Sequence, residues 1–231
     1  IMAHGFSATI DMGLDAFARV FCDAGITVLA YDQRNFGVSD GEPRQEINIW
    51  AQARDYFRAI DWLSARPEVD AQRVGIWGSS FSGGEVMVVA ACDRRVAAVI
   101  ANVPFASLPD TEDRLATPGV CETIRGGVLD ESGSGPADAG GDPIGPLAVV
   151  AQEGLDLPVF LSFPEATQWF LEHGARASRT WQNRVTLRNL PSGPPPFDPG
   201  VCASHIAPVP LLMVVASEDQ LAPTDGALLS F

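Results

Sequence analysis

The first 108 residues alternate short apolar runs with amphipathic helical stretches, and this alternation restricts the fold more than any other feature. The apolar runs are residues 1–3, Ile26–Tyr31, Val74–Trp77 and Val96–Val103. Between them, residues 11–24, 49–66 and 81–91 have helical character, with apolar side chains at helical spacing most clearly in 49–66. Strict alternation of strand and helix predicts parallel strands joined by right-handed crossovers, with helices on both faces of the sheet. The sequence therefore predicts an α/β fold with a mostly parallel, doubly wound sheet.

The alternation stops after Leu108 and resumes near the end of the chain. Residues 118–146 are rich in Gly, Pro, Asp and Ser, which predicts a long surface loop. Helical spacing returns around Pro164–His173 and Trp181–Leu190, and Leu211–Ala216 predicts a further buried strand. We therefore predict a first part of the core in residues 1–108, an inserted cap or lid in 109–207 and a return to the core in 208–231.

Composition argues against several classes of function. The net charge is -14, with 29 acidic residues against 15 basic ones, all Arg, and this argues against a nucleic-acid partner. The longest apolar runs are far shorter than the ~20 residues that cross a bilayer, so no membrane span is expected. Four widely spaced cysteines and three histidines predict no metal site and no disulfide framework, and we expect no cofactor. No signal peptide is visible, which favours a cytoplasmic location.

Residues 73–84 carry the strongest signal for chemistry. A strand ends at Gly78, a helix begins near Phe81, and Ser80 lies on the sharp turn between them. The segment fits the motif G-x-S-x-G, here G-S-S-F-S, with Ser82 in place of the last glycine. Such a nucleophile elbow exposes the serine hydroxyl at the carboxyl edge of the sheet, and the helix N-terminus behind it favours developing negative charge. The predicted nucleophile is Ser80.

Two other interpretations of this segment stay open at this point. Ser82 also fits a relaxed form of the motif, although counting from the strand end places it in the first helical turn. The whole segment can also be a Ser/Gly-rich loop that only caps a helix. Further motifs elsewhere in the chain therefore have to decide between a catalytic elbow and a simple cap.

A second motif follows the first strand, where a serine hydrolase has its oxyanion loop. The sequence there is H-G-F-S over residues 4–7. The backbone N–H of Phe6 would join the N–H of Phe81 in binding the oxyanion of a tetrahedral intermediate. We expect a structural role for His4 and assign it no proton transfer.

The acid of a Ser-Asp-His triad is predicted just after the last strand, at Asp219, with Glu218 and Asp225 as alternatives. An ordinary loop aspartate is the other interpretation of this position. None of the three histidines follows Asp219 in the chain. His173 closes a cap helix, where its charge would suit the helix dipole, and His205 precedes a strand, where a turn or capping role is expected. The chain therefore supplies a nucleophile and an acid but no predicted base.

Together these motifs resemble the α/β-hydrolase superfamily. Within it, they resemble the bacterial dienelactone-hydrolase-like and serine-aminopeptidase-like enzymes related to X-Pro peptidases. The resemblance rests on residues 4–7, 31–39, 78–84, 181–188 and 210–223. It implies a catalytic histidine after Phe231 and a chain truncated at both ends, with terminal strands missing and two sheet edges exposed.

The predicted function is that of a serine hydrolase that cleaves a carboxylic ester, or an amide, of a small-molecule acyl substrate through an acyl-enzyme on Ser80. The cap aromatics Trp169, Phe170 and Trp181 suggest an apolar pocket. Without the base, the fragment itself would be impaired. The alternatives are a non-catalytic or inactive fragment, and an acyltransferase or peptidase on the same fold.

Overall fold

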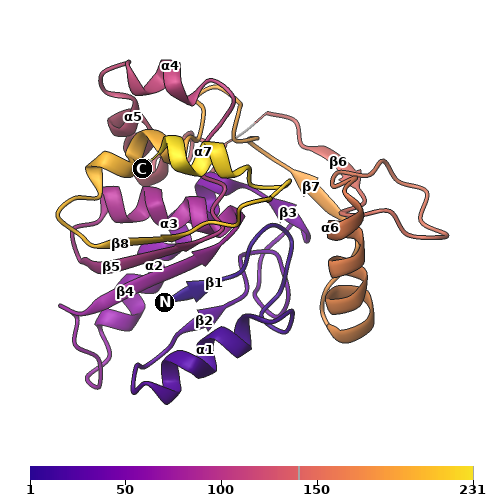
Figure 1. Cartoon of the computed structure of the whole chain (residues 1–231), viewed down its shortest axis with the longest axis horizontal. Coiled ribbons are helices and arrows are strands. Elements are labelled where there is room, and N and C mark those ends of the chain that lie inside the picture. The colour runs from indigo at the N-terminus through magenta and orange to yellow at the C-terminus, as the bar shows by residue number, and fades with distance from the viewer. Residues whose placement is uncertain (140, 231) are drawn as a thin grey trace.

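A five-stranded parallel sheet forms the centre of the molecule, as Figure 1 shows for the computed structural model. The structure describes residues 1–139 and 141–230; Gly140, in the predicted loop, and Phe231 lie outside the described residues. The strand order is β2-β1-β4-β5-β8, and every neighbouring pair is parallel. The strands are β1 (Met2–Ala3), β2 (Ala30–Tyr31), β4 (Val74–Ser79), β5 (Val96–Asn102) and β8 (Leu211–Val214). The predicted parallel α/β architecture is confirmed.

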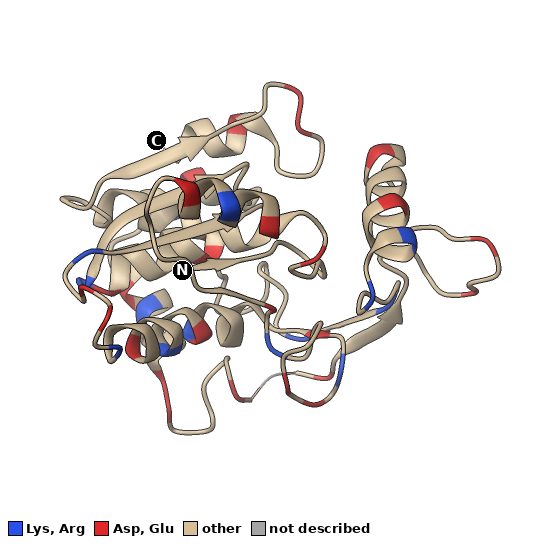
Figure 2. Ribbon diagram, turned by 90° about the horizontal axis from the view of Figure 1, so that it is seen from below, with Lys and Arg blue, Asp and Glu red and all other residues tan. Residues whose placement is uncertain are grey.

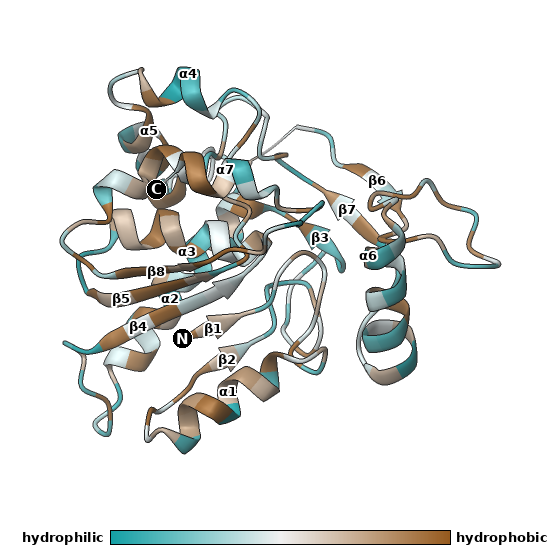
Figure 3. Cartoon of the chain, in the orientation of Figure 1, coloured by the Kyte–Doolittle hydropathy of each residue, from teal (hydrophilic) through white to brown (hydrophobic). Residues whose placement is uncertain are grey.

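Helices cover both faces of this sheet. Helix α1 (Leu14–Asp23) packs on one face, where Leu14 joins Met2 and Trp77 in a small apolar cluster. Helices α2 (Ile49–Ser64) and α3 (Phe81–Cys92) lie on the other face and contribute to the main core. The side chain of Asn48 caps the start of α2 by accepting the N–H groups of its first turn. Strand β5 lies between β4 and β8 and is predominantly hydrophobic, as expected of a parallel strand inside a sheet; β8, at the edge of the described sheet, is also hydrophobic (Figure 3).

The segment after β5 is more structured than the sequence predicts. It begins with helix α4 (Thr111–Leu115), and the predicted loop 118–146 contains helix α5 (Val120–Leu129). Helix α5 and the 3₁₀-helix η2 (Pro199–His205) pack over α3, and buried residues of both belong to the main core. The prediction of a continuous loop is wrong because the apolar side chains of α5 find partners only in the tertiary fold.

A second, three-stranded sheet lies beside the first. Its order is β3-β7-β6, with β3 and β7 parallel and β6 and β7 antiparallel. The strands are β3 (Glu46–Ile47), β6 (Ile144–Leu147) and β7 (Val185–Leu187). The helical spacing predicted for Trp181–Leu190 is therefore wrong: Val185 and Leu187 are buried with Thr186 between them, which is the alternation of a strand.

A helical arm accompanies the second sheet. Helix α6 (Pro164–Trp169) continues into the π-helix η1 (Phe170–Ala177), which extends beyond the helix predicted for Pro164–His173. The short helix α7 (Thr224–Leu229) follows the loop after β8.

The predicted cap boundaries 109–207 stay a prediction. Within that range, α5 and η2 pack on the core helix α3, whereas β3, outside it, pairs with β7.

None of the helices in the described part of the chain combines the length and the apolar composition that crossing a membrane requires.

Candidate active site

Ser80 lies at the junction of β4 and α3 in a strained backbone conformation. Its φ of 56° and ψ of -115° lie in a region that L-residues rarely adopt. Its N–H donates to the carbonyl of Asn102 (2.9 Å), and its own carbonyl accepts from the N–H of Phe105 (2.8 Å) and of Gly84 (3.2 Å). Such strain costs about 1–3 kcal/mol, and these three hydrogen bonds offset it. The end of β5 therefore holds the turn that carries Ser80.

Small residues on either side allow this turn to form. A Cβ at Gly78 would collide with the carbonyl oxygen of Ser82, so glycine is required there. Ser82 stands where the motif has its last glycine and is fully buried. Its hydroxyl accepts from the N–H of Ser79 (2.9 Å) and donates to the carbonyl of Ala3 (2.9 Å). The side chain of Ser82 is thus engaged in joining the elbow to β1, whereas that of Ser80 is partly exposed.

The loop after β1 passes directly over this elbow. A Cβ at Gly5 would lie 3.1 Å from the Cβ of Ser80 and 3.7 Å from the backbone nitrogen of Phe81. The N–H groups of Phe6 and Phe81 donate to no protein acceptor in residues 1–139 and 141–230. Phe81 opens α3, where N–H groups have no partner within the helix. The structure therefore brings together the three groups that the sequence predicts for nucleophile and oxyanion hole, and their roles stay a prediction.

The side chain of His4 is hydrogen-bonded to this loop at Gly5. Its Nε2 accepts the backbone N–H of Gln33 (3.0 Å), so its Nδ1, 2.9 Å from the carbonyl oxygen of Gly5, carries the proton. Burial lowers the pKa of His4, although the carboxylate of Asp32 lies 3.6 Å from Nε2. A neutral ring with both nitrogens engaged fits the structural role predicted for this histidine.

An aromatic wall, which we define as Phe6, Phe81, Phe105 and Phe160, adjoins the elbow. The ring of Phe6 meets that of Phe81 edge-on, with centroids 5.7 Å apart, and stacks on Phe160 at 4.8 Å. Phe81 in turn lies 6.0 Å from Phe105. Three of these rings belong to residues beside the elbow, and Phe160 comes from the segment between β6 and α6. The wall gives the neighbourhood of Ser80 an apolar surface.

The three cap aromatics singled out from the sequence lie elsewhere. Phe170 and Trp181 stack with centroids 5.7 Å apart within the apolar core of the second sheet. Trp169 meets Phe170 edge-on at 4.9 Å and is partly exposed. The aromatic surface beside Ser80 is therefore the aromatic wall, whose four residues sequence reasoning did not assign to a pocket.

Asp219 lies in the loop after β8, at the same edge of the sheet as Ser80. Strand register places Ser79, Asn102 and Val214 side by side on β4, β5 and β8. The Oδ1 atom of Asp219 accepts two backbone N–H groups of its own loop, from Leu221 and Ala222, both at 2.8 Å. In the described residues it forms no hydrogen bond with Ser80.

A cleft of about 630 Å³ separates this acid loop from helix α6. Its lining residues are Phe163, Pro164, Glu165, Glu218, Asp219, Gln220 and Leu221. The cleft is acidic, in keeping with the excess of acidic over basic positions along the ribbon in Figure 2. Such a lining disfavours strongly anionic substrates near the predicted acid.

No histidine of the described residues hydrogen-bonds to Ser80 or Asp219. His173 is exposed on η1, with its ring centroid 5.2 Å from that of Trp169. The Nδ1 of His205 lies 3.8 Å from the carboxylate of Glu122, where η2 meets α5. Neither is placed to serve as the base of a triad.

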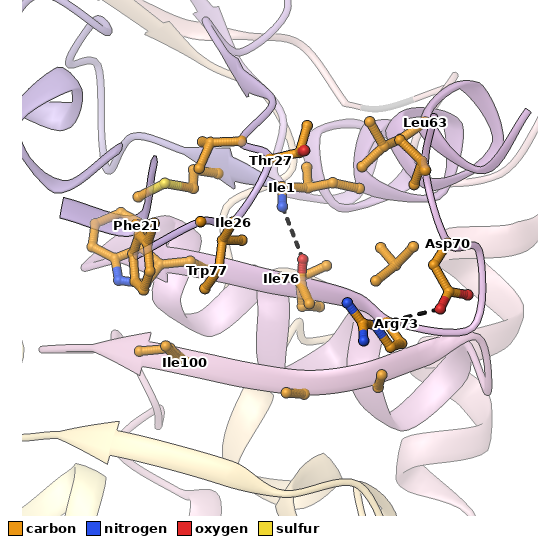
Figure 4. Close-up of a pocket in the computed structure, with 18 of the residues that line it drawn as sticks. Ile1, Phe21, Ile26, Thr27, Leu63, Asp70, Arg73, Ile76, Trp77 and Ile100 are labelled. Carbon is orange, nitrogen blue, oxygen red and sulfur yellow. Dashed lines mark hydrogen bonds and ion pairs between the residues drawn. The ribbon is translucent and has the colours of Figure 1, made fainter. Parts of the chain in front are cut away.

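A second pocket of about 560 Å³ opens at the other end of β4 (Figure 4). It is mainly apolar, with Ile76, Trp77 and Ile100 of the sheet facing Phe21 and Ile26. Ligands of open α/β sheets bind at the carboxyl ends of the strands, and Ser80 follows that end of β4. The candidate site therefore stays at the elbow.

Sequence reasoning missed two groups near the elbow. Asn102 accepts the N–H of Ser80, and its side-chain amide donates to the hydroxyl of Ser79 at 3.0 Å. Glu85 is fully buried on α3 and accepts a hydrogen bond from Gln33 at 2.7 Å. A lone carboxylate in an otherwise apolar helix is a signal that could have identified Glu85.

Comparisons with known proteins agree with this geometry. Residues 4–189 match the family model described as X-Pro dipeptidyl-peptidase (S15 family). The quorum-quenching protein AidA of Acinetobacter baumannii is 46% identical over 105 residues, which are 46% of this chain and 34% of that protein. Thiohydrolase aneE of Aspergillus aculeatus is 41% identical over 105 residues, 46% of this chain and 33% of that protein. The aligned part thus spans about a third of these two relatives.

Two further relatives align over nearly the whole chain. Acyltransferase drtE of Aspergillus calidoustus is 26% identical over 238 residues, covering 97% of this chain and 71% of that protein. The crystal structure of the alpha/beta hydrolase GrgF from Penicillium sp. sh18 superposes with a TM-score of 0.70 at 30% identity, covering 100% of this chain and 75% of that one. The resemblance to α/β hydrolases is thereby confirmed. The chain belongs to the X-Pro dipeptidyl-peptidase (S15) family and has the α/β-hydrolase fold.

Proposed function

We propose that the whole protein containing this chain is a serine hydrolase that transfers acyl groups from small carboxylic esters, or the related amides and thioesters, to water. One observation carries the proposal: Ser80 stands, partly exposed, in a strained conformation between β4 and α3, with the Gly5 loop packed over it. Strained turns of this kind present nucleophiles in hydrolases of this fold. We include thioesters among the proposed substrates because a relative is named a thiohydrolase.

In the proposed reaction, the hydroxyl oxygen of Ser80 bonds to the carbonyl carbon of the substrate, and its proton passes to a base. The N–H groups of Phe6 and Phe81 hold the oxyanion. The bond to the leaving group then breaks, and the base returns the proton to that group. Water attacks the acyl-enzyme in the same way and releases the acid and free Ser80.

Asp219 would orient the base, which in this proposal is a histidine outside these 231 residues. That assignment is supported by the positions of the chain's own histidines. His4 has both nitrogens engaged, and the other two lie on η1 and η2 without a hydrogen bond to Ser80 or Asp219 in the described residues. The acid and base roles follow the order serine, acid, histidine along the chain.

Transfer to an acceptor other than water is the second candidate function. It is favoured by the alignment of 97% of this chain with a protein named acyltransferase. The apolar aromatic wall beside Ser80 fits either reaction, because both bind an acyl group before the acceptor arrives. Adding alcohols or thiols to the assay and identifying the products separates the two reactions.

A fluorophosphonate probe and p-nitrophenyl esters of increasing acyl length test the proposal on the whole protein. We expect Ser80→Ala to abolish labelling and to lower kcat by roughly 10⁶-fold. The matched control is Ser82→Ala, which keeps the labelled residue. A wild-type protein that the probe does not label, or labelling that survives Ser80→Ala, would overturn the assignment.

A further inference from the structure

Glu85 is a buried carboxyl group that the proposed reaction does not use. It lies on α3 in a run of buried residues, Ser82–Cys92, and is itself fully buried. A buried carboxylate without a cation is strongly disfavoured. The side chain of Gln33 donates to its Oε2 at 2.7 Å, and burial raises the pKa of Glu85 well above its usual range. Burial thus favours the protonated, neutral form of Glu85.

Among the described residues, no cation neutralises Glu85. The hydroxyls of Tyr31 and Tyr56 lie near it, and burial raises the pKa of both. The carboxylate of Asp55 also acts on Glu85 and raises its pKa further. Arg34 is occupied by Asp55, with its Nε 2.6 Å from that carboxylate. Burial and the nearby carboxylate of Asp55 therefore favour the protonated form of Glu85, while the hydrogen bond from Gln33 acts in the opposite direction.

Protonation of Glu85 would also give a hydrogen-bond partner to two buried oxygen atoms that otherwise have none. The Oε1 of Gln33 and the Oε1 of Glu85 are both buried and have no hydrogen-bond partner among the described residues. Two such acceptors on hydrogen-bonded side chains are costly when the acid is ionised. A proton on Glu85 turns its Oε1 into a donor for the amide oxygen of Gln33, so that acid and amide can pair through both ends.

This pair continues into the oxyanion loop. The backbone N–H of Gln33 donates to Nε2 of His4 at 3.0 Å, and Nδ1 of His4 donates to the carbonyl of Gly5 at 2.9 Å. Glu85, Gln33 and His4 are all buried. A chain of three hydrogen bonds, which we name the buried brace, therefore connects α3 to the loop through Glu85, Gln33, His4 and Gly5.

The two ends of the buried brace belong to the two segments that adjoin Ser80, the loop at Gly5 and helix α3. Gly5 packs against Ser80, since a Cβ there would lie 3.1 Å from that of the serine. Glu85 stands five positions after Ser80 on the helix that opens with Phe81. The brace thus links the two segments whose N–H groups, from Phe6 and Phe81, have to converge on one oxyanion. Oxyanion donors act only when they are held in place before charge develops.

We propose that Glu85 is a positioning residue, which through Gln33 and His4 holds the Phe6 N–H in register with the Phe81 N–H above Ser80. This inference rests on the proposed acyl-enzyme function. Glu85 does not touch the substrate and transfers no proton in the reaction. Its effect falls on the stabilisation of the transition state and leaves ground-state binding unchanged.

Three variants of the whole protein test the buried brace. Glu85→Gln keeps a neutral partner of the same shape for Gln33, Glu85→Leu removes it, and Gln33→Met breaks the brace at its second member. The matched control is Gln52→Met, a buried glutamine on α2 outside the brace. The readouts are the rate of fluorophosphonate labelling of Ser80, kcat and KM for a p-nitrophenyl ester, and thermal unfolding.

We expect Glu85→Leu and Gln33→Met to lower kcat and the labelling rate at least tenfold while KM stays within about twofold. Glu85→Gln and Gln52→Met should remain within about threefold of the wild type. Equal labelling and kcat in all four variants would overturn the inference and leave Ser80 as the nucleophile. Failure of the wild type to label would instead overturn the proposed function. If Glu85→Leu does not fold, Gln33→Met and the rescue by Glu85→Gln decide.

Discussion

Ser80 and Asp219 follow strands of the same parallel sheet at the same edge, yet the chain holds them in different ways. The backbone of Ser80 is bonded to Asn102 and Phe105, more than 20 residues away, and is overlaid by the loop at Gly5. Within residues 1–139 and 141–230, the carboxylate of Asp219 accepts only N–H groups from its own loop. The difference shows that long-range contacts hold the proposed nucleophile, whereas the proposed acid is held by its own loop, and its Oδ2 has no hydrogen bond among the described residues.

Among substitutions that leave Ser80 itself in place, the largest effect should come from the locally held Asp219. Asp219→Asn keeps an Oδ1 acceptor for the two N–H groups of the loop but removes the charge that would orient a base. We expect kcat for a p-nitrophenyl ester to fall by roughly 10⁴-fold while thermal unfolding hardly changes. Glu218→Gln, its neighbour in the same cleft, is the control and should stay within about twofold. A loss as large in Glu218→Gln would move the acid role to that residue.

A smaller loss should follow from displacing the loop above the elbow. A Cβ on Gly5 would lie 2.9 Å from the carbonyl oxygen of Ser79, so Gly5→Ala pushes the loop away from Ser80. We expect kcat to fall by roughly 10²–10³-fold, as for the loss of one oxyanion donor. Gly126→Ala in α5 is the control, because nothing lies within 4 Å of its new methyl group. It should leave kcat unchanged and stabilise the helix by about 0.5–1 kcal/mol.

The same contrast explains what the sequence could and could not predict. The elbow was predictable because its requirements are local: Gly78 must lack a side chain, and Ser80 must lie between a strand and a helix. Helix α5 and strand β7 were not, because their apolar residues find their partners only across the tertiary structure. The link between Gln33 and Glu85 joins positions 52 residues apart, and no spacing rule reports such a contact.

Next in size is an effect on stability without an effect on labelling. Ser82→Ala removes a buried hydroxyl that bonds the N–H of Ser79 and the carbonyl of Ala3. We expect a loss of about 1–3 kcal/mol in the free energy of unfolding, since both groups are left unpaired. Ser204→Ala at an exposed position is the control and should change it by less than about 0.5 kcal/mol. Urea unfolding measures both, and Ser82→Ala protein that remains folded should still be labelled. Loss of labelling in folded Ser82→Ala would mean that the two serines had been assigned the wrong way round.

The smallest effect should be a pH dependence of the free energy of unfolding that comes from His4, beside the elbow. Burial lowers the pKa of His4 in the folded chain, so below its ordinary value of 6.5 the unfolded chain binds a proton that the folded chain does not. Stability should therefore fall as the pH drops below about 6.5, by no more than about 1.4 kcal/mol per pH unit. His4→Asn keeps a donor near Gly5 but loses the ring that accepts the N–H of Gln33, so the free energy of unfolding should be lower at every pH. Because Asn does not titrate, the free energy of unfolding should also fall less steeply as the pH drops from 7.5 to 5.5. Urea unfolding at pH 7.5, 6.5 and 5.5 gives the two slopes, with His205→Gln on the surface as the control for histidine loss. Equal slopes in wild type and His4→Asn would show that the ring accepts a proton in the folded state, which the hydrogen bond from Gln33 to its Nε2 does not permit.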